Sequence, residues 1–223
     1  RPDAGLYHLP YISLLNEEKI VFGAVNLHFR FGHVSSLQYL SSLFNNFLFK
    51  DNGVLIPLTI IYSASLLFFY DEFKKNSNNK SAKLFSFFSI IFILTSMNRY
   101  GEFGNDDPAV FFYLITIYYF LTNFILKSHD TTEIFNKVLL FSASVFLIKQ
   151  FYALIVFFPL YLLIISYKKI KIINNTVIFS FLFVGFWLFK NLLVTACIIY
   201  PINFTCIDSL SWSASETNYS AKI

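Results

Sequence analysis

Residues 138–167 read VLLFSASVFLIKQFYALIVFFPLYLLIISY, an apolar run of 30 residues with one charged side chain, Lys149, near its centre. As a single helix the run would be about 45 Å long, well over the roughly 30 Å of membrane hydrocarbon. It would also bury a lysine in mid-membrane, at a cost of several kcal/mol. Two short helices, 138–148 and 151–167, avoid both problems because the lysine then reaches a membrane surface. The sequence therefore predicts a helical hairpin that turns at Lys149-Gln150.

Four more apolar segments surround this hairpin. They are of about the length that a membrane helix needs, although one of them is short; they cover 53–70, 84–97, 109–126 and 176–195. Together with the hairpin they predict six spans within 53–195. The expected fold class is all-α, a polytopic transmembrane helical bundle, with 1–52 and 196–223 as loops outside the membrane.

Composition agrees with a membrane protein and excludes a nucleic-acid partner. Of the 223 residues, 56% are hydrophobic and 13% are charged, and there are 30 Phe and 14 Tyr. The formal charge of +4 is modest, and the lysines cap membrane segments rather than forming a continuous basic groove. Membrane lipids are thus the expected surroundings.

Nine of the 17 Lys and Arg residues fall in three loops, 71–83, 127–137 and 168–175. Short basic loops stay on the cytoplasmic side of a membrane, so these three are predicted to be cytoplasmic. Most of the chemically active side chains then belong to the opposite, outer side.

The first outer loop contains two predicted amphipathic helices. Leu6, Leu9 and Ile12 recur at helical spacing in 5–16, with Pro10 as a kink. A second stripe runs through 34–49, with Leu37, Leu40, Phe44, Phe47 and Leu48 on one face. Such helices lie in the membrane interface or against the bundle.

An acid, a phenol and an imidazole come close together at the start of this loop. Asp3 is followed one turn later by Tyr7 and His8. A carboxylate beside an apolar surface has its pKa raised toward the range of a general base. Asp3 is the predicted catalytic residue, with Tyr7 and His8 beside the substrate; the plain alternative is a solvated aspartate.

A second group of charged side chains precedes 109–126. Arg99 is followed by Asp106 and Asp107, just before Pro108. One aspartate is expected to cap the helix, which leaves the other to face a cavity. Arg99 and Lys149 are cations at the depth of a lipid phosphate and could bind one, or simply snorkel to the surface.

His28 and Arg30 lie in the loop between the two amphipathic helices, with His33 close by. No second ligand set accompanies them at a recognised spacing, so no metal site and no cofactor is predicted, although a divalent metal is not excluded. Hydrogen bonding to a sugar or phosphate suits His28 and Arg30 better, with loop packing as the alternative.

Two features concern the ends of the chain. Cys197 and Cys206 flank a proline-containing outer loop and could form a disulfide or stay as free thiols. The chain opens with Arg-Pro-Asp rather than Met, which leads us to expect a segment of a longer protein, with a membrane helix upstream.

Three short motifs carry a resemblance to a known class. They are Asp3-Ala-Gly-Leu-Tyr-His-Leu9, Asn26-Leu-His-Phe-Arg30 and Lys190-Asn191…Tyr200-Pro201. In their order along the membrane segments the chain resembles the GT-C class of membrane glycosyltransferases, and more closely uncharacterised bacterial multi-pass proteins with the same motifs. The resemblance covers nearly the whole chain.

The resemblance implies an inverting glycosyltransferase at the outer face of a bacterial inner membrane, with a polyprenyl-phosphate-linked sugar as donor. It matches Asp3 to the acid of the first outer loop, Asp106-Asp107-Pro108 to a second acidic element, and Lys149 to a basic residue at a hairpin tip. The alternative is a lipid-linked oligosaccharide transporter or a non-catalytic membrane scaffold. A transporter usually has ionisable residues at mid-membrane, where this chain has almost none.

Overall fold

Helices form the regular structure of this chain, which confirms the all-α prediction. The computed structural model describes residues 4–18, 20–33, 35–76, 79–98, 103–125 (backbone alone at 123–125) and 130–213, and these ranges contain no strand. The α-helices are α1 (Leu9–Glu18), α2 (Ser36–Phe44), α3 (Ile56–Lys75), α4 (Lys80–Ser96), α5 (Asp106–Ile125), α6 (Thr131–Ile148), α7 (Phe157–Ser166) and α8 (Asn175–Thr195). Shorter turns are the π-helical η1 (Ala4–His8) and the 3-10 helices η2 (Ala24–Asn26), η3 (Phe29–Gly32), η4 (Lys50–Leu55), η6 (Gln150–Val156) and η7 (Asn203–Thr205).

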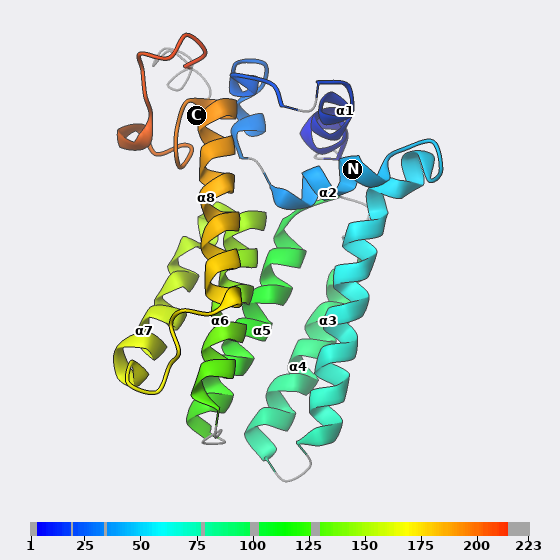
Figure 1. The fold of residues 1–223 in the computed structure, drawn as a ribbon. Helices are drawn as coiled ribbons and strands as arrows, with labels where there is room; N and C mark the ends of the chain where they lie inside the picture. Colours follow the sequence, from blue (N-terminus) through cyan, green and yellow to red (C-terminus); the bar gives the residue numbers. More distant parts are fainter. Residues whose placement is uncertain are drawn as a thin grey trace.

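Helices α3 to α8 form a bundle in which successive helices run in opposite directions (Figure 1). The ends of α3, α5 and α7 and the starts of α4, α6 and α8 lie toward the lower end in that view. Helices α1 and α2 and the segment after α8 cover the upper end. One end of the bundle is therefore built from short connections, and the other from longer, folded segments.

Three helical stretches are long and apolar enough to cross a membrane: Lys50–Lys75, Thr131–Ile148 and Asn175–Thr195. Their composition indicates a multi-pass membrane protein. The stretch Gln150–Ser166 is apolar but shorter. Many side chains on the outside of the bundle are exposed and hydrophobic, among them Phe183 and Phe186 on α8 and Ile164 on α7. Such faces suit contact with lipid.

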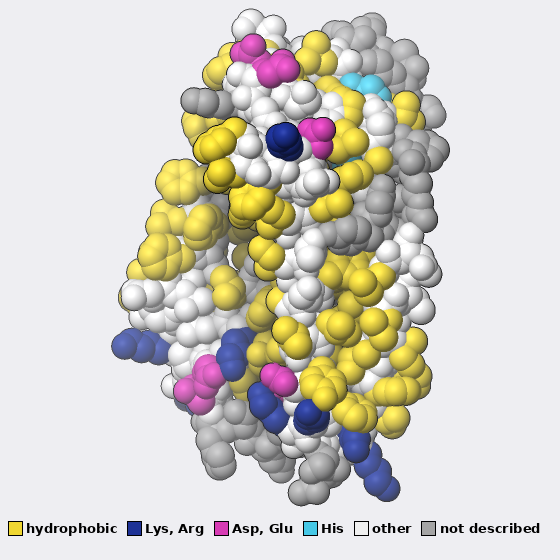
Figure 2. Space-filling view, turned by 90° about the vertical axis from the view of Figure 1, so that its right-hand side faces the viewer, with side chains coloured by type: hydrophobic (Ala, Val, Ile, Leu, Met, Phe, Trp, Pro, Cys, Tyr) yellow, Lys and Arg dark blue, Asp and Glu magenta, His cyan; other side chains and the backbone are white. Residues whose placement is uncertain are grey.

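Hydrophobic side chains cover the middle of the face shown in Figure 2, and most charged side chains lie toward its two ends. The basic residues predicted to lie in loops mostly sit on helix ends instead. Lys74 and Lys75 end α3, Lys80 begins α4, and Lys137 lies within α6. The predicted loops 71–83 and 127–137 are thus too long, because Asn79 and Asp130 cap the next helices through the N–H groups of Ala82 and Glu133.

The predicted turn in 138–167 is present. Helix α6 ends at Ile148, Lys149 is extended (φ −148°, ψ 103°), and the chain continues through η6 into α7. The first arm of this hairpin begins at Thr131 rather than at 138, since Asp130 caps it. The turn places Lys149 at the upper end of the bundle.

The helix predicted over 34–49 is shorter than expected. Helix α2 ends at Phe44, and only Leu37 of the predicted stripe is buried; Phe47 is 86% exposed. The Asn46 side chain accepts hydrogen bonds from the N–H groups of Leu48 and Phe49. This local turn satisfies backbone donors that a continuing helix would have used, so the helix stops.

The predicted helix 5–16 is a π-helical turn, η1, followed by α1. Pro10 lies within this continuous helical run, next to the change from π-helix to α-helix. The turn of η1 directs Tyr7 and His8 toward the bundle, and His8 is buried.

Candidate functional site

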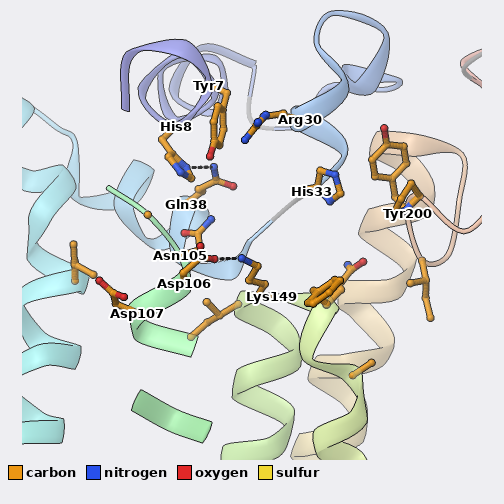
Figure 3. A pocket seen from close by; sticks show the side chains of 18 of the residues that line it. Tyr7, His8, Arg30, His33, Gln38, Asn105, Asp106, Asp107, Lys149 and Tyr200 are labelled. Carbon is orange, nitrogen blue, oxygen red and sulfur yellow. Dashed lines mark hydrogen bonds and ion pairs between the residues drawn. The ribbon is translucent and has the colours of Figure 1, made fainter. Parts of the chain in front are cut away.

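A pocket of about 900 Å³ opens at the upper end of the bundle, between the start of α5, the end of α6 and the segments that cover them. Figure 3 shows side chains from η1, η3, α2, α5 and the segment after α8 pointing into it. Six of the eight predicted substrate-binding residues line it, together with His33: Tyr7, His8, Arg30, Asp106, Asp107 and Lys149. The pocket thus unites groups more than 100 residues apart in the sequence.

Asp106 and Lys149 form an ion pair on the floor of the pocket. The pair exists because α6 breaks at Lys149 while α5 begins at Asp106, so both side chains leave helix ends on the same side. Half of the Asp106 side chain and a third of the Lys149 side chain are exposed. The pair therefore stays in reach of a ligand.

Asp107 is held by another helix. The Tyr62 hydroxyl of α3 lies 3.1 Å from Asp107 Oδ2 and 3.1 Å from the Ser96 carbonyl oxygen. The expectation that one aspartate caps α5 is not met: Asn105 occupies the capping position, since its carbonyl accepts the first helical N–H, that of Ala109. Both aspartates line the pocket instead.

Two buried polar atoms at the pocket lack a hydrogen-bond partner in the described ranges, Asn105 Oδ1 and Gln150 Nε2. A buried polar group without a partner costs about 1–3 kcal/mol. One is an acceptor and the other a donor, and they flank the Asp106–Lys149 pair in sequence. They suit a ligand with hydroxyl groups, which donate and accept.

The first outer segment supplies the opposite wall. His8 Nδ1 lies 3.2 Å from the Gln38 side-chain nitrogen, and Arg30 stacks over the Tyr7 ring at 4.7 Å. Gln38 was not predicted as a site residue. Its capping box with Ser35 is a visible sequence signal, but it indicates a helix start rather than a pocket.

His33 packs edge-on against the Tyr200 ring, with ring centres 5.1 Å apart. Although its side chain is exposed to the pocket, partial desolvation by the surrounding protein, followed by the nearby charges of Arg30 and Lys149, lowers the pKa of His33 below its ordinary value. His33 is therefore a mainly neutral imidazole at neutral pH.

Tyr200 closes this wall because Gly32 leaves room for it. A Cβ atom on Gly32 would lie 2.6 Å from the Tyr200 ring, closer than real contacts allow. The segment that holds Tyr200 is closed by a disulfide between Cys197 and Cys206, which answers the question left open by the sequence. The Asn191 side chain donates to the Ile198 carbonyl and ties this segment to α8.

His28 does not line the pocket. Its Nδ1 accepts the N–H of Arg30 at 3.2 Å, and its ring stacks on Phe29. These contacts within η3 agree with the loop-packing alternative. Asp3 and Arg99 lie outside the described residues, although Ala4, next to Asp3, is buried.

Lys190 has a different setting from the pocket residues. It is 8% exposed, and its ammonium lies 3.1 Å from the centre of the Trp187 ring and 4.9 Å from that of Tyr39. Within the described ranges its Nζ has no hydrogen-bond partner. Behind it the Tyr39 and Tyr11 hydroxyls are 3.2 Å apart, and burial raises the pKa of both phenols.

No group of three His, Cys, Asp or Glu side chains that could hold a metal ion occurs in the part of the chain that the structure describes.

Comparison with known proteins places the chain in a family. No curated protein and no solved structure matches it. A family model described as "Domain of unknown function (DUF8201)" matches residues 1–222, nearly the whole chain. The chain belongs to the DUF8201 family.

Proposed function

We propose that this protein is a membrane glycosyltransferase of the GT-C class, which transfers a sugar from a polyprenyl-phosphate donor at the outer face of a bacterial inner membrane. The observation that carries the proposal is the pocket at one end of a membrane bundle. It combines carboxylates, cations and two unpartnered polar groups with apolar walls. A polar sugar phosphate on a lipid chain presents the matching chemistry.

Two observations support the outer location of the pocket. The lysines at the end of α3, at the start of α4 and in the α7–α8 connection lie at the opposite end of the bundle, which by the positive-inside rule faces the cytoplasm. The Cys197–Cys206 disulfide lies at the pocket end, and disulfides persist in oxidising compartments. Both observations favour a pocket that opens on the outer, non-cytoplasmic side of the membrane.

In the proposed reaction Asp3 removes the proton of the acceptor hydroxyl as its oxygen attacks the anomeric carbon of the sugar. The bond from that carbon to the phosphate oxygen breaks on the opposite side, and the lipid phosphate leaves with the electron pair. Lys149 and Arg30 stabilise the charge on this leaving group. Asp106 is already paired with Lys149, and Asp107 with Tyr62, so these two aspartates suit positioning better than proton removal.

The sugar itself would meet the polar atoms around the ion pair. Asn105 Oδ1 accepts and Gln150 Nε2 donates hydrogen bonds, and a sugar hydroxyl can satisfy either. The apolar wall formed by Phe151, Ile199 and Ile202 suits the first isoprene units of the donor.

The proposal is tested with the full-length protein in proteoliposomes, a panel of radiolabelled polyprenyl-phosphate hexoses, and membranes of the host as the acceptor source. Asp3→Asn should lower transfer about 100- to 10,000-fold, the usual effect of removing a general base. Asp208→Asn is the matched control, since Asp208 is exposed at the same end and does not line the pocket.

Transfer by Asp3→Asn within a few-fold of the unmodified protein would reject Asp3 as the base. Labelled donor that crosses the bilayer without transfer of its sugar would favour the transporter alternative.

Orientation has its own test. Cysteines introduced at Lys171 and at Phe204, which is 91% exposed, should differ in their reactivity with a membrane-impermeant thiol reagent in intact spheroplasts. Position 204 should react because it lies at the pocket end, and position 171 should be protected because it lies in the α7–α8 connection at the other end. The native cysteines form a disulfide and do not compete for the reagent. The reverse pattern would overturn the proposed orientation.

A further inference from the structure

Three basic side chains face the same part of the pocket (Figure 3): Arg30 and His33 from η3 and the residue after it, and Lys149 from the break after α6. Lys149 is paired with Asp106. Arg30 has cation–π contacts with Tyr7 and Phe29, and no ion pair joins it to a carboxylate in the described part of the chain. This side of the pocket therefore has positive charge to spare.

The pKa of His33 depends on this positive charge. Partial desolvation, followed by the charges of Arg30 and Lys149, lowers the pKa of His33 and keeps its ring mainly neutral at neutral pH. The other titratable or charged groups that line the pocket come from η1, α3, α5 and the segment after α8: Tyr7, His8, Tyr62, Asp106, Asp107 and Tyr200. A bound anion next to Arg30 would reverse the balance, since a negative charge within about 4–6 Å favours the protonated form of an imidazole.

We propose that His33 takes up a proton when a phosphate monoester binds beside Arg30 and Lys149, so that the pocket selects a doubly charged phosphate over a singly charged one. The site thus adjusts its own charge to that of its ligand. The imidazolium also donates hydrogen bonds from both ring nitrogens, and these bonds are charge-assisted. The neutral ring donates from one nitrogen only.

The role of this proton in catalysis rests on the proposed function, whereas the binding experiment that tests its uptake does not. In the proposed transfer the donor is a phosphodiester with one negative charge, and the product is a phosphate monoester with two. The acceptor hydroxyl releases one proton in the same step. A proton held on His33 beside the leaving phosphate offsets the extra negative charge, and it departs when the product does.

The test is calorimetric titration of the full-length protein in detergent with farnesyl phosphate at about pH 7.5, where a phosphate monoester is largely a dianion. Running it in two buffers with different heats of ionisation measures the protons taken up. We expect roughly one proton per bound phosphate, and a Kd that rises by up to about tenfold per pH unit above neutrality. In His33→Gln the uptake should vanish and the Kd should change less than about twofold over the same range.

His28→Asn is the matched control. His28 comes from the same loop, lies outside the pocket lining, and caps η3 through a side-chain acceptor that Asn retains. This variant should take up protons as the unmodified protein does. Farnesyl methyl phosphate, a singly charged diester, should bind with much less uptake.

Competition by inorganic phosphate distinguishes the two sources of a phosphate group. If it displaces farnesyl phosphate, the phosphate group alone is recognised; if it does not, the lipid-linked form is required.

Binding of farnesyl phosphate without proton uptake would overturn the inference and leave the transfer assay unaffected. Uptake that survives His33→Gln and disappears in His8→Gln would also overturn it, by assigning the proton to His8. Conversely, proton-coupled binding in a protein that transfers no sugar would uphold the inference and reject the proposed function.

Discussion

Lys149 and Lys190 lie at the same end of the bundle, but their ammonium groups have opposite surroundings. Lys149 stands at a helix break, pairs with Asp106 and faces an open pocket. Lys190 lies inside an unbroken helix, is 8% exposed and rests on the rings of Trp187 and Tyr39. Only the first arrangement leaves the charge available to a ligand.

The difference indicates that a helix break, and not the lysine itself, leaves a cation open to the pocket here. At Lys149 the end of α6 exposes a side chain to the pocket and lets the start of α5 supply a carboxylate. At Lys190 the helix continues, and aromatic rings replace water around the ammonium. Cation–π contacts contribute up to about 2 kcal/mol when desolvated, against a desolvation cost of several kcal/mol. We therefore infer that Lys149 binds substrate and that Lys190 packs the upper end.

The largest effect is expected where the aromatic cage is removed. Trp187→Ala should lower the free energy of unfolding by about 3–5 kcal/mol, because it leaves a cavity and strips Lys190 of its nearest ring. The measurement is denaturant unfolding in detergent, followed by circular dichroism. Phe186→Ala is the control: its side chain is 68% exposed on the outer face of α8 and should matter much less. Equal effects of the two changes would contradict the packing role of the cage.

A smaller loss is expected from opening the disulfide. Cys197→Ser with Cys206→Ser removes a cross-link that closes a short loop, worth about 2–3 kcal/mol by chain entropy. Because Ile199, Tyr200 and Ile202 form a wall of the pocket, farnesyl phosphate should also bind less tightly. Unfolding and binding titrations on the same sample check both. Unchanged binding would show that the wall stands without the disulfide.

The smallest effect is expected at the buried lysine. Lys190→Met keeps the length of the side chain and removes its charge, so the free energy of unfolding should change by less than about 1 kcal/mol or rise. Thermal unfolding measures it, with Lys190→Glu as a comparison that reverses the charge and should destabilise strongly. A loss of several kcal/mol in Lys190→Met would mean that the ammonium itself, through a partner outside the described residues, stabilises the fold.

The sequence predicts the helical part of this comparison well, for a physical reason. A charged residue in the middle of a long apolar run is so costly in lipid that the chain must turn there, and it does so at Lys149. Basic residues likewise mark the end of the bundle opposite the pocket. Helix ends are less predictable, because single side chains decide them: Asp130 starts α6 early, and Asn46 stops further helix after α2.

The pocket was predictable only in part. Short motifs identify Tyr7, His8 and Arg30 because polar groups stand out in an apolar chain. Tyr62 gave no signal, since a tyrosine in an apolar helix looks like any lipid-facing aromatic until α5 packs against it. The separation of His33 from His28 depends on a turn of η3, which places one ring in the pocket and the other against Phe29.

The most direct test of the central claim is the binding of a radiolabelled polyprenyl-phosphate hexose to the unmodified full-length protein and to four variants of it. We expect Lys149→Ala to weaken binding about 10- to 100-fold through loss of a charge-assisted hydrogen bond, Lys149→Arg to stay within a few-fold, and Lys190→Met to bind like the unmodified protein. Adding Asp106→Asn to Lys149→Ala should not restore binding, because the cation itself contacts the phosphate. Undiminished binding by Lys149→Ala, restoration in the double variant, or an equal loss in Lys190→Met would contradict the claim that Lys149 is the lysine that binds substrate.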